Sequence, residues 1–129
     1  MKRIEKAGFK IKRMFYGEGS VKMWQQHYQE HQARPFFTEL CTDMANKEFV
    51  GYHLERENAV TTLRDMIGAT DPETAAPGTL RRDFGKTKRW NAVHGSATPE
   101  EADREIELWF EKGCSDPESL FEYTEENDL

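Results

Sequence analysis

The chain has 129 residues and a formal net charge of −6, with 36% apolar and 12% aromatic residues. That length and composition suffice for one domain with a real hydrophobic core. No apolar run is long enough to span a bilayer and no signal-peptide pattern is present, so we expect a cytoplasmic protein with no membrane partner.

The charge is unevenly distributed along the chain. Residues 1–98 hold 16 basic and 12 acidic side chains, whereas residues 99–129 hold 2 basic and 12 acidic ones. The first part therefore has a net charge of +4 and the second a net charge of −10. We expect a domain over residues 1–110 and an acidic C-terminal tail over residues 111–129.

The first half of the chain predicts alternating helices and strands. Gly8 is expected to end a helix, and Ser20 and Pro35 are expected to begin two others. Apolar and basic residues alternate from Phe9 to Tyr16, as in a half-exposed strand. The expected elements are a helix end at 1–7, a strand at 9–16, helices at 21–28 and 36–44, and a strand at 49–54.

The second half predicts a helix, a long loop, a short strand and a second helix. Asn58 is expected to cap the first helix and Gly68 to end it. Residues 69–90 look irregular, and long loops inside compact domains are usually functional. Ala92-Val93 is expected to form the strand. The chain is thus expected to be α+β, with helices on one face of an antiparallel sheet.

The segment Asn91-Ala-Val-His94-Gly-Ser96 carries the strongest chemical signal. It presents an imidazole between a strand end and a helix N-terminus, a place that favours an anion. A partly neutral imidazole there can attack phosphorus. The alternative is a loop histidine with one ordinary hydrogen bond.

The helix that follows supplies a candidate partner for His94. Thr98 is expected as its N-cap and Glu101 as the capping-box residue. Glu105 lies at the edge of the apolar stripe, where an unpaired carboxylate would be costly. A carboxylate bonded to one imidazole nitrogen leaves the other nitrogen to attack. The alternative for Glu105 is a solvated charge on the helix surface.

Other reactive motifs are absent or incomplete. Cys41 and Cys114 lack CxxC spacing, so we expect reduced thiols. His27 and His31 do not form HExxH, because Tyr28 stands where the glutamate would be. There is no GxxxxGK[ST] phosphate loop.

Five segments resemble, in order and spacing, the nucleoside diphosphate kinase family. They are His27-Tyr28, Arg34-Pro-Phe36-Phe, Ile67-Gly-Ala-Thr70-Asp-Pro72, Pro77-Gly-Thr-Leu-Arg81-Arg-Asp-Phe84, and Asn91 to Phe110 with its His94-Gly-Ser and Glu105. The resemblance implies a ferredoxin-like fold and transfer of a phosphoryl group from nucleoside triphosphates to nucleoside diphosphates through phosphohistidine. It also implies Mg²⁺ as cofactor, held mainly by phosphates and water, and a homo-oligomer, either hexamer or tetramer.

The resemblance also assigns roles to single residues. His94 would be the nucleophile, Glu105 would orient its ring and Tyr28 would lie near it. Arg64 and Arg81 would neutralise the phosphates, and Thr70 would hydrogen-bond one of them. The remaining roles are base stacking by Phe36, lining of the base slot by Leu40, and a ribose hydrogen bond from Asn91. By itself, Arg64 could equally be a solvated arginine, and Phe36, Phe37 and Phe84 could be core residues.

The chain departs from the family pattern in several places. Ala97 stands where an acidic residue is usual, Arg82 replaces a glycine, and Asn46-Lys47-Glu48 replaces a Gly-Pro turn. The chain begins in the middle of the family's first helix, without the first strand and the Lys-Pro-Asp segment after it. We expect an N-terminally truncated fold, with Met1 an internal methionine of a longer protein. Alternatively, another chain supplies the missing part, or the chain is a degraded relative of the family. These 129 residues alone should then show weak activity or none.

Two other classes of function stay open. A non-catalytic nucleotide-binding or assembly module would keep the fold and lose turnover, as the absent lysine favours. A nucleic-acid binder would use the basic loop around Arg81-Arg82 and the aromatic residues, but the overall acidity argues against it.

Overall fold

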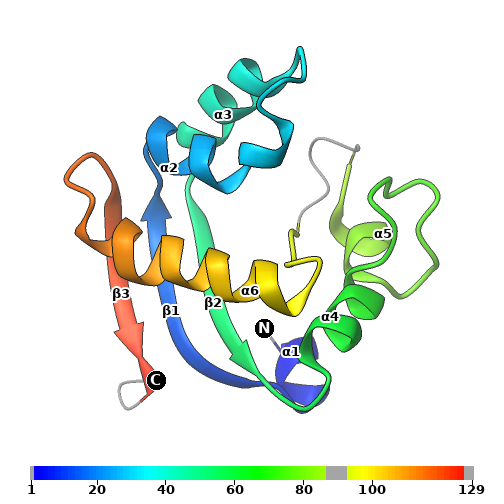
Figure 1. Ribbon diagram of the computed structural model, residues 1–129. Coiled ribbons are helices and arrows are strands. Elements are labelled where there is room, and N and C mark those ends of the chain that lie inside the picture. The colour runs from blue at the N-terminus through cyan, green and yellow to red at the C-terminus, as the bar shows by residue number, and fades with distance from the viewer. Residues whose placement is uncertain (1, 87–92, 127–129) are drawn as a thin grey trace. The chain divides into compact units, whose positions relative to one another are not determined.

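The computed structural model describes residues 2–86 and 93–126. Their contacts divide the chain into two compact units. Unit 1 comprises residues 1–56 and 103–129, and unit 2 comprises residues 57–102. Figure 1 shows the elements of both units, and each unit is described by itself below.

A three-stranded antiparallel sheet forms the base of unit 1. The strands are β1 (Lys10–Glu18), β2 (Phe49–Glu55) and β3 (Leu120–Glu125), in the order β2-β1-β3 (Figure 1). Both outer strands run antiparallel to β1. The predicted antiparallel sheet and its first two strands are therefore confirmed. Within the predicted acidic tail over residues 111–129, Leu120–Glu125 forms a strand that pairs with β1 from Arg13 to Glu18.

An aromatic core lies on one face of this sheet. Phe15 at the middle of β1 is 1% exposed, and its register partner in β2 is Gly51. A side chain at Gly51 would collide with the Phe15 ring, since its Cβ would lie 2.2 Å from Cζ. Buried residues from the helices complete the core: Met23, Trp24, Cys41, Leu108, Trp109 and Phe110.

Short helices with recognisable end signals supply these core residues. Ser20 caps α2 (Val21–His27), because its hydroxyl accepts a hydrogen bond from the Met23 amide at 3.2 Å. Gly8 follows α1 (Lys2–Lys6) with a φ of +89°, a conformation that favours glycine. Both predicted signals are confirmed. The helices of this part are α1 (Lys2–Lys6), α2 (Val21–His27), the 3₁₀ turn η1 (Gln29–His31) and α3 (Phe37–Ala45).

The long C-terminal helix changes its pitch. α6 (Pro99–Ile106) continues directly into the π-helical segment η2 (Glu107–Lys112), followed by the 3₁₀ turn η3 (Gly113–Ser115). The wider π turn buries Leu108, Trp109 and Phe110 in succession, which no α-helix with one apolar stripe would do.

Unit 2 contains α4 (Ala59–Ile67) and α5 (Leu80–Phe84). Gly68 ends α4 as predicted, with a φ of +88°. Asn58 precedes α4 as predicted, but in the left-handed conformation and with no side-chain cap bond. The stretch 69–90, expected to be irregular, contains α5, which Thr79 caps through the Arg82 amide. Val93 is not in a strand, and Ala92 lies outside the described residues.

The helix cap before α6 also belongs to unit 2. The Thr98 hydroxyl accepts a hydrogen bond from the Glu101 amide at 3.1 Å, and the Glu101 carboxylate accepts one from the Ala97 amide at 3.3 Å. This is the predicted capping box, with its return bond displaced by one residue. Within the described ranges, no helix is both long enough and apolar enough to cross a membrane.

Candidate active site

Arg81 of α5 holds the segment that leads into His94. Its Nε and Nη2 donate to the carbonyl oxygen of Val93 at 3.1 and 3.0 Å, and its Nη1 donates to the carbonyl of Gly68 at 3.3 Å. The guanidinium thus joins the end of α4 to the residue before His94. A half-buried guanidinium that makes three such hydrogen bonds has a structural role and is not a solvated surface charge.

Two glycines let the chain approach closely around this arginine. A Cβ on Gly95 would lie 2.7 Å from Cδ1 of Ile67, which is buried in α4. A Cβ on Gly68 would lie 2.6 Å from the Thr79 hydroxyl oxygen. The glycine after His94 is therefore required by packing against α4. His94 itself is exposed, in a segment without regular structure.

Arg64 lies one turn before the end of α4, beside the same segment. Its Nη1 donates to the carbonyl oxygen of Ala97 at 3.3 Å. It lines a shallow pocket of about 300 Å³ together with Val60, Thr61, Asp65, Gly68 and Ala97. Arg64 and Arg81 therefore contact the two ends of the segment from Val93 to Ala97, and they place two positive charges around the loop that carries His94.

The turn after α4 carries Thr70, whose side chain is exposed. Asp71 organises this turn, since its carboxylate accepts from the Glu73 amide and its carbonyl from the Ala75 amide. Arg82, which departs from the family pattern, donates to the carbonyl of Pro72 at 3.4 Å. The unusual arginine therefore has a local structural role in the turn.

Glu105 lies in unit 1, on α6, with only 12% of its side chain exposed. Its Oε1 is 3.8 Å from Nδ1 of His27, whose side chain is 7% exposed. The alternative of a solvated surface charge is therefore wrong. The predicted interaction of Glu105 with His94 would join the two units and stays a prediction.

His27 is a candidate residue whose role the sequence did not reveal. The Trp109 indole Nε1 donates to its Nδ1 at 2.9 Å. The Arg104 guanidinium donates to the backbone carbonyls of Gln26 and His27 at 3.1 and 3.3 Å. The end of α2 is thus tied to α6 and η2 at three points. No local pattern signals this, because the partners are about 80 residues apart and the π turn directs Trp109.

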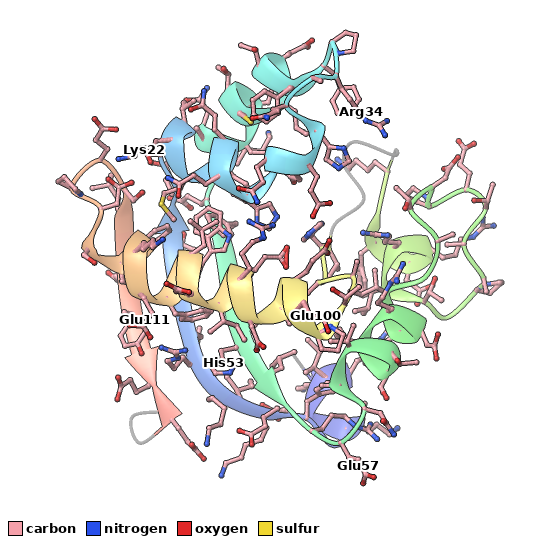
Figure 2. All side chains as sticks on the ribbon, viewed as in Figure 1. Lys22, Arg34, His53, Glu57, Glu100 and Glu111 are labelled. Carbon is pink, nitrogen blue, oxygen red and sulfur yellow. The ribbon has the colours of Figure 1, made fainter. Side chains whose placement is uncertain are left out.

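The remaining unit 1 candidates lie at the ends of α2 and α3. The Tyr28 ring is perpendicular to that of His27, with 4.7 Å between centroids. Phe36 precedes α3 and is 42% exposed, so it is not a core residue, and Leu40 is half-buried one turn later. Arg34, labelled in Figure 2, has its Cζ 6.0 Å from the centroid of the Phe36 ring.

The alternative that Phe37 and Phe84 are core residues is confirmed for the first and wrong for the second. Phe37 packs against the core of unit 1, as that alternative requires. Phe84 is 62% exposed, so the core alternative is wrong for it.

The structure thus groups the candidates in two sets. Within unit 2, Arg64 and Arg81 contact the segment that contains His94. Within unit 1, Glu105 and Tyr28 flank His27. Phe36 and Leu40 are neighbours one helical turn apart, Thr70 lies on the turn after α4, and Asn91 lies outside the described residues.

The comparison with known proteins covers most of the chain. Residues 1–114 match the sequence profile of the family described as nucleoside diphosphate kinase. The chain is 44% identical over 109 residues to the nucleoside diphosphate kinase of Exiguobacterium sibiricum, which covers 84% of this chain and 79% of that protein. It is 42% identical over 114 residues to that of Deinococcus radiodurans, covering 86% and 80% of the two chains.

Solved structures of this family share the fold. The Aquifex aeolicus nucleoside diphosphate kinase matches with a TM-score of 0.79 and 36% identity, over 83% of this chain and 78% of that one. The Halobacterium salinarum enzyme, solved in complex with CDP, matches with a TM-score of 0.80 and 32% identity, over 92% and 77%. These matches confirm the α+β, ferredoxin-like fold. The chain belongs to the nucleoside diphosphate kinase family and is a phosphotransferase that acts on nucleotides.

Proposed function

We propose that this chain transfers the terminal phosphoryl group of a nucleoside triphosphate to a nucleoside diphosphate, through a phosphohistidine formed on His94. The observation that carries the proposal is the pair of arginines that contact the His94 segment from α4 and α5. Two guanidinium groups around an exposed imidazole suit phosphate oxygens, which they bind bidentately.

The reaction has two half-steps on one side chain. An imidazole nitrogen of His94 attacks the γ-phosphorus, the bond from that phosphorus to the bridging oxygen breaks, and the diphosphate leaves with the electron pair. A terminal oxygen of a second nucleoside diphosphate then attacks the phosphohistidine, and the imidazole nitrogen is the leaving group. Such transfer depends on positioning and on charge neutralisation more than on further covalent chemistry.

The chain's own side chains have stated roles in this proposal. Arg64 and Arg81 neutralise the phosphates, and Thr70 hydrogen-bonds one of them. Glu105, a poorly exposed carboxylate, orients the His94 ring, and Tyr28 lies beside it.

The residues proposed to hold the nucleoside do not discriminate between different bases. The exposed Phe36 ring stacks on the base, Leu40 lines that slot and Asn91 hydrogen-bonds the ribose. The Halobacterium salinarum relative, solved with CDP, supports a nucleoside diphosphate as ligand.

Mg²⁺ fits this chain as part of a metal–nucleotide complex. Arg64 and Arg81 contact the segment that carries His94, and their guanidinium groups repel a bare cation but suit the phosphates that carry one. When bound, the ion neutralises phosphate charge. A homo-oligomer and a cytoplasmic location complete the proposal.

The decisive test is a labelling experiment with γ-³²P-ATP and Mg²⁺. We expect acid-labile, base-stable label on the protein, lost in His94→Ala and transferred to added GDP. His53→Ala is the matched control, because His53 lies on β2 and has no role in the proposal (Figure 2). Binding of nucleotide without any label on His94 would overturn the proposal and support a non-catalytic nucleotide-binding module.

A further inference from the structure

Nδ1 of His27 lies between a hydrogen-bond donor and a carboxylate. Trp109 Nε1 is 2.9 Å from it, and Glu105 Oε1 is 3.8 Å from it. The first distance is a hydrogen bond and the second is too long for one. An indole N–H can only donate, so Nδ1 must accept with its lone pair. The neutral imidazole then carries its proton on Nε2.

This arrangement opposes the charged form of His27. A doubly protonated imidazole has an N–H at Nδ1, which would point at the indole N–H. Its natural partner would be the Glu105 carboxylate, which has little water around it at 12% exposure. Two other described neighbours of His27 in unit 1 do not favour a positive charge. Arg104 donates to the His27 carbonyl at 3.3 Å, and the Tyr28 ring is neutral.

We propose that Trp109 is a positioning residue, whose indole N–H keeps His27 neutral and thereby prevents it from drawing the Glu105 carboxylate into an ion pair. The inference rests on the proposed function, in which Glu105 orients the His94 ring. Glu105 would perform that task poorly if its charge were shared with an imidazolium ion on α2. Without the indole donor, Nδ1 takes up a proton from solvent, and the resulting imidazolium N–H pairs with the Glu105 carboxylate.

The π turn makes this arrangement possible. η2 begins at Glu107, between Glu105 on α6 and Trp109, and it buries the Trp109 ring next to that of His27, with 5.7 Å between the ring centroids. π-helical turns are frequent at functional sites, where they redirect a side chain. In this proposal η2 positions the Trp109 indole for His27 in addition to packing the core.

Trp109→Phe tests the role of the indole N–H, and Trp24→Phe is its matched control. Trp24 is equally buried in the same aromatic cluster, with its ring centroid 4.7 Å from that of Trp109. Its Nε1 finds no hydrogen-bond partner among the described residues. Both variants remove the same atoms from one core, so a general loss of packing affects them alike.

The first measurement follows the His27 ring nitrogens by ¹⁵N NMR in the full chain. In the wild type and in Trp24→Phe we expect Nδ1 unprotonated and Nε2 protonated at neutral pH. In Trp109→Phe the midpoint of His27 protonation should move up by about one pH unit or more, because the carboxylate then pairs with Nδ1–H. An unchanged midpoint and tautomer in Trp109→Phe would overturn the inference.

The second measurement is the pH profile of phosphohistidine formation. Trp109→Phe should lose about tenfold in rate at pH 6 relative to pH 8, beyond any loss in Trp24→Phe. The double variant Trp109→Phe/His27→Asn should regain the pH profile of Trp24→Phe, because an asparagine cannot take up the charge. Persistence of the acid loss in the double variant counts against the inference. If the wild type forms no phosphohistidine, the proposed function fails while the NMR titration still decides the inference.

A third measurement needs no variant that could fail to fold. As wild-type His27 becomes protonated at low pH, the indole N–H resonance of Trp109 should move because its acceptor is lost. The Trp24 resonance should stay in place. Equal behaviour of the two indoles would contradict the proposed hydrogen bond.

Discussion

Arg81 donates two hydrogen bonds to the carbonyl oxygen of Val93, the residue directly before His94. The same guanidinium reaches the carbonyl of Gly68 at the end of α4. One side chain therefore positions the segment of the proposed nucleophile within unit 2, in addition to the charge that it would offer to phosphate in the proposed reaction.

The first prediction concerns this arginine. Arg81→Ala should destabilise the chain by about 1–3 kcal/mol, because it leaves half-buried carbonyls without their charged donor. It should also lower the rate of phosphohistidine formation by tenfold or more, as measured by ³²P labelling. Arg82→Ala is the control, since Arg82 contacts the 72–73 turn and not Val93. Equal labelling rates in the two variants would show that the bonds to Val93 do not matter.

The second prediction tests the close approach at Gly95. Gly95→Ala should cost about 1–3 kcal/mol of stability, because the new methyl group would lie 2.7 Å from Cδ1 of Ile67. Ile67→Val removes that atom and should cost about 1 kcal/mol by itself. The double variant should be more stable than the sum of the two costs predicts, as measured by urea unfolding. Strictly additive costs would mean that the two residues do not meet.

The third prediction concerns Phe36. Phe36→Ala should weaken nucleoside diphosphate binding by about 1–3 kcal/mol in calorimetry, because base stacking is worth that much. The free energy of unfolding should change little, since the ring is 42% exposed. Phe84→Ala removes a ring that is 62% exposed from α5 and should leave binding unchanged. Unaltered affinity in Phe36→Ala would remove this residue from the nucleotide site.

The fourth prediction is a pH dependence of stability. The Ser20 hydroxyl donates to the Asp116 carboxylate at 2.6 Å, and the Glu118 amide and the Ser119 hydroxyl also donate to it. These hydrogen bonds, that of Ser20 first, lower the pKa of Asp116 in the folded chain. A lowered pKa means that the carboxylate stabilises the fold fully above the ordinary value of 3.8 and loses this effect as the pH falls through the lowered pKa.

Asp116→Asn tests that dependence. The variant should be less stable than the wild type at pH 7, and the difference in urea unfolding should shrink as the pH falls below about 4. Asp103→Asn, on the exposed side of α6, is the control and should not reproduce this pattern. A difference that stays constant between pH 7 and pH 3 would contradict the assignment.

Local signals determined a large part of this fold from the sequence alone. Alternation of apolar and basic residues predicts β1, and Ser20, Gly8, Gly68 and Thr98 mark element ends that the structure confirms. These signals can be recognised in the sequence because capping bonds and backbone preferences act over three or four residues. The motifs around His94 indicated the family in the same way, because their residues, order and spacing are all visible in the sequence.

The tertiary structure alone decided which distant residues meet. β3 arises in an acidic segment because its backbone pairs with β1, about 105 residues away, and pairing outweighs a weak local preference for strand. α5 forms within the stretch that glycines and prolines made look irregular, where Arg81 contacts Val93. The π turn brings Trp109 to His27, 82 residues earlier. Such contacts depend on packing and burial of the whole unit, and no short window of sequence contains the groups that make them.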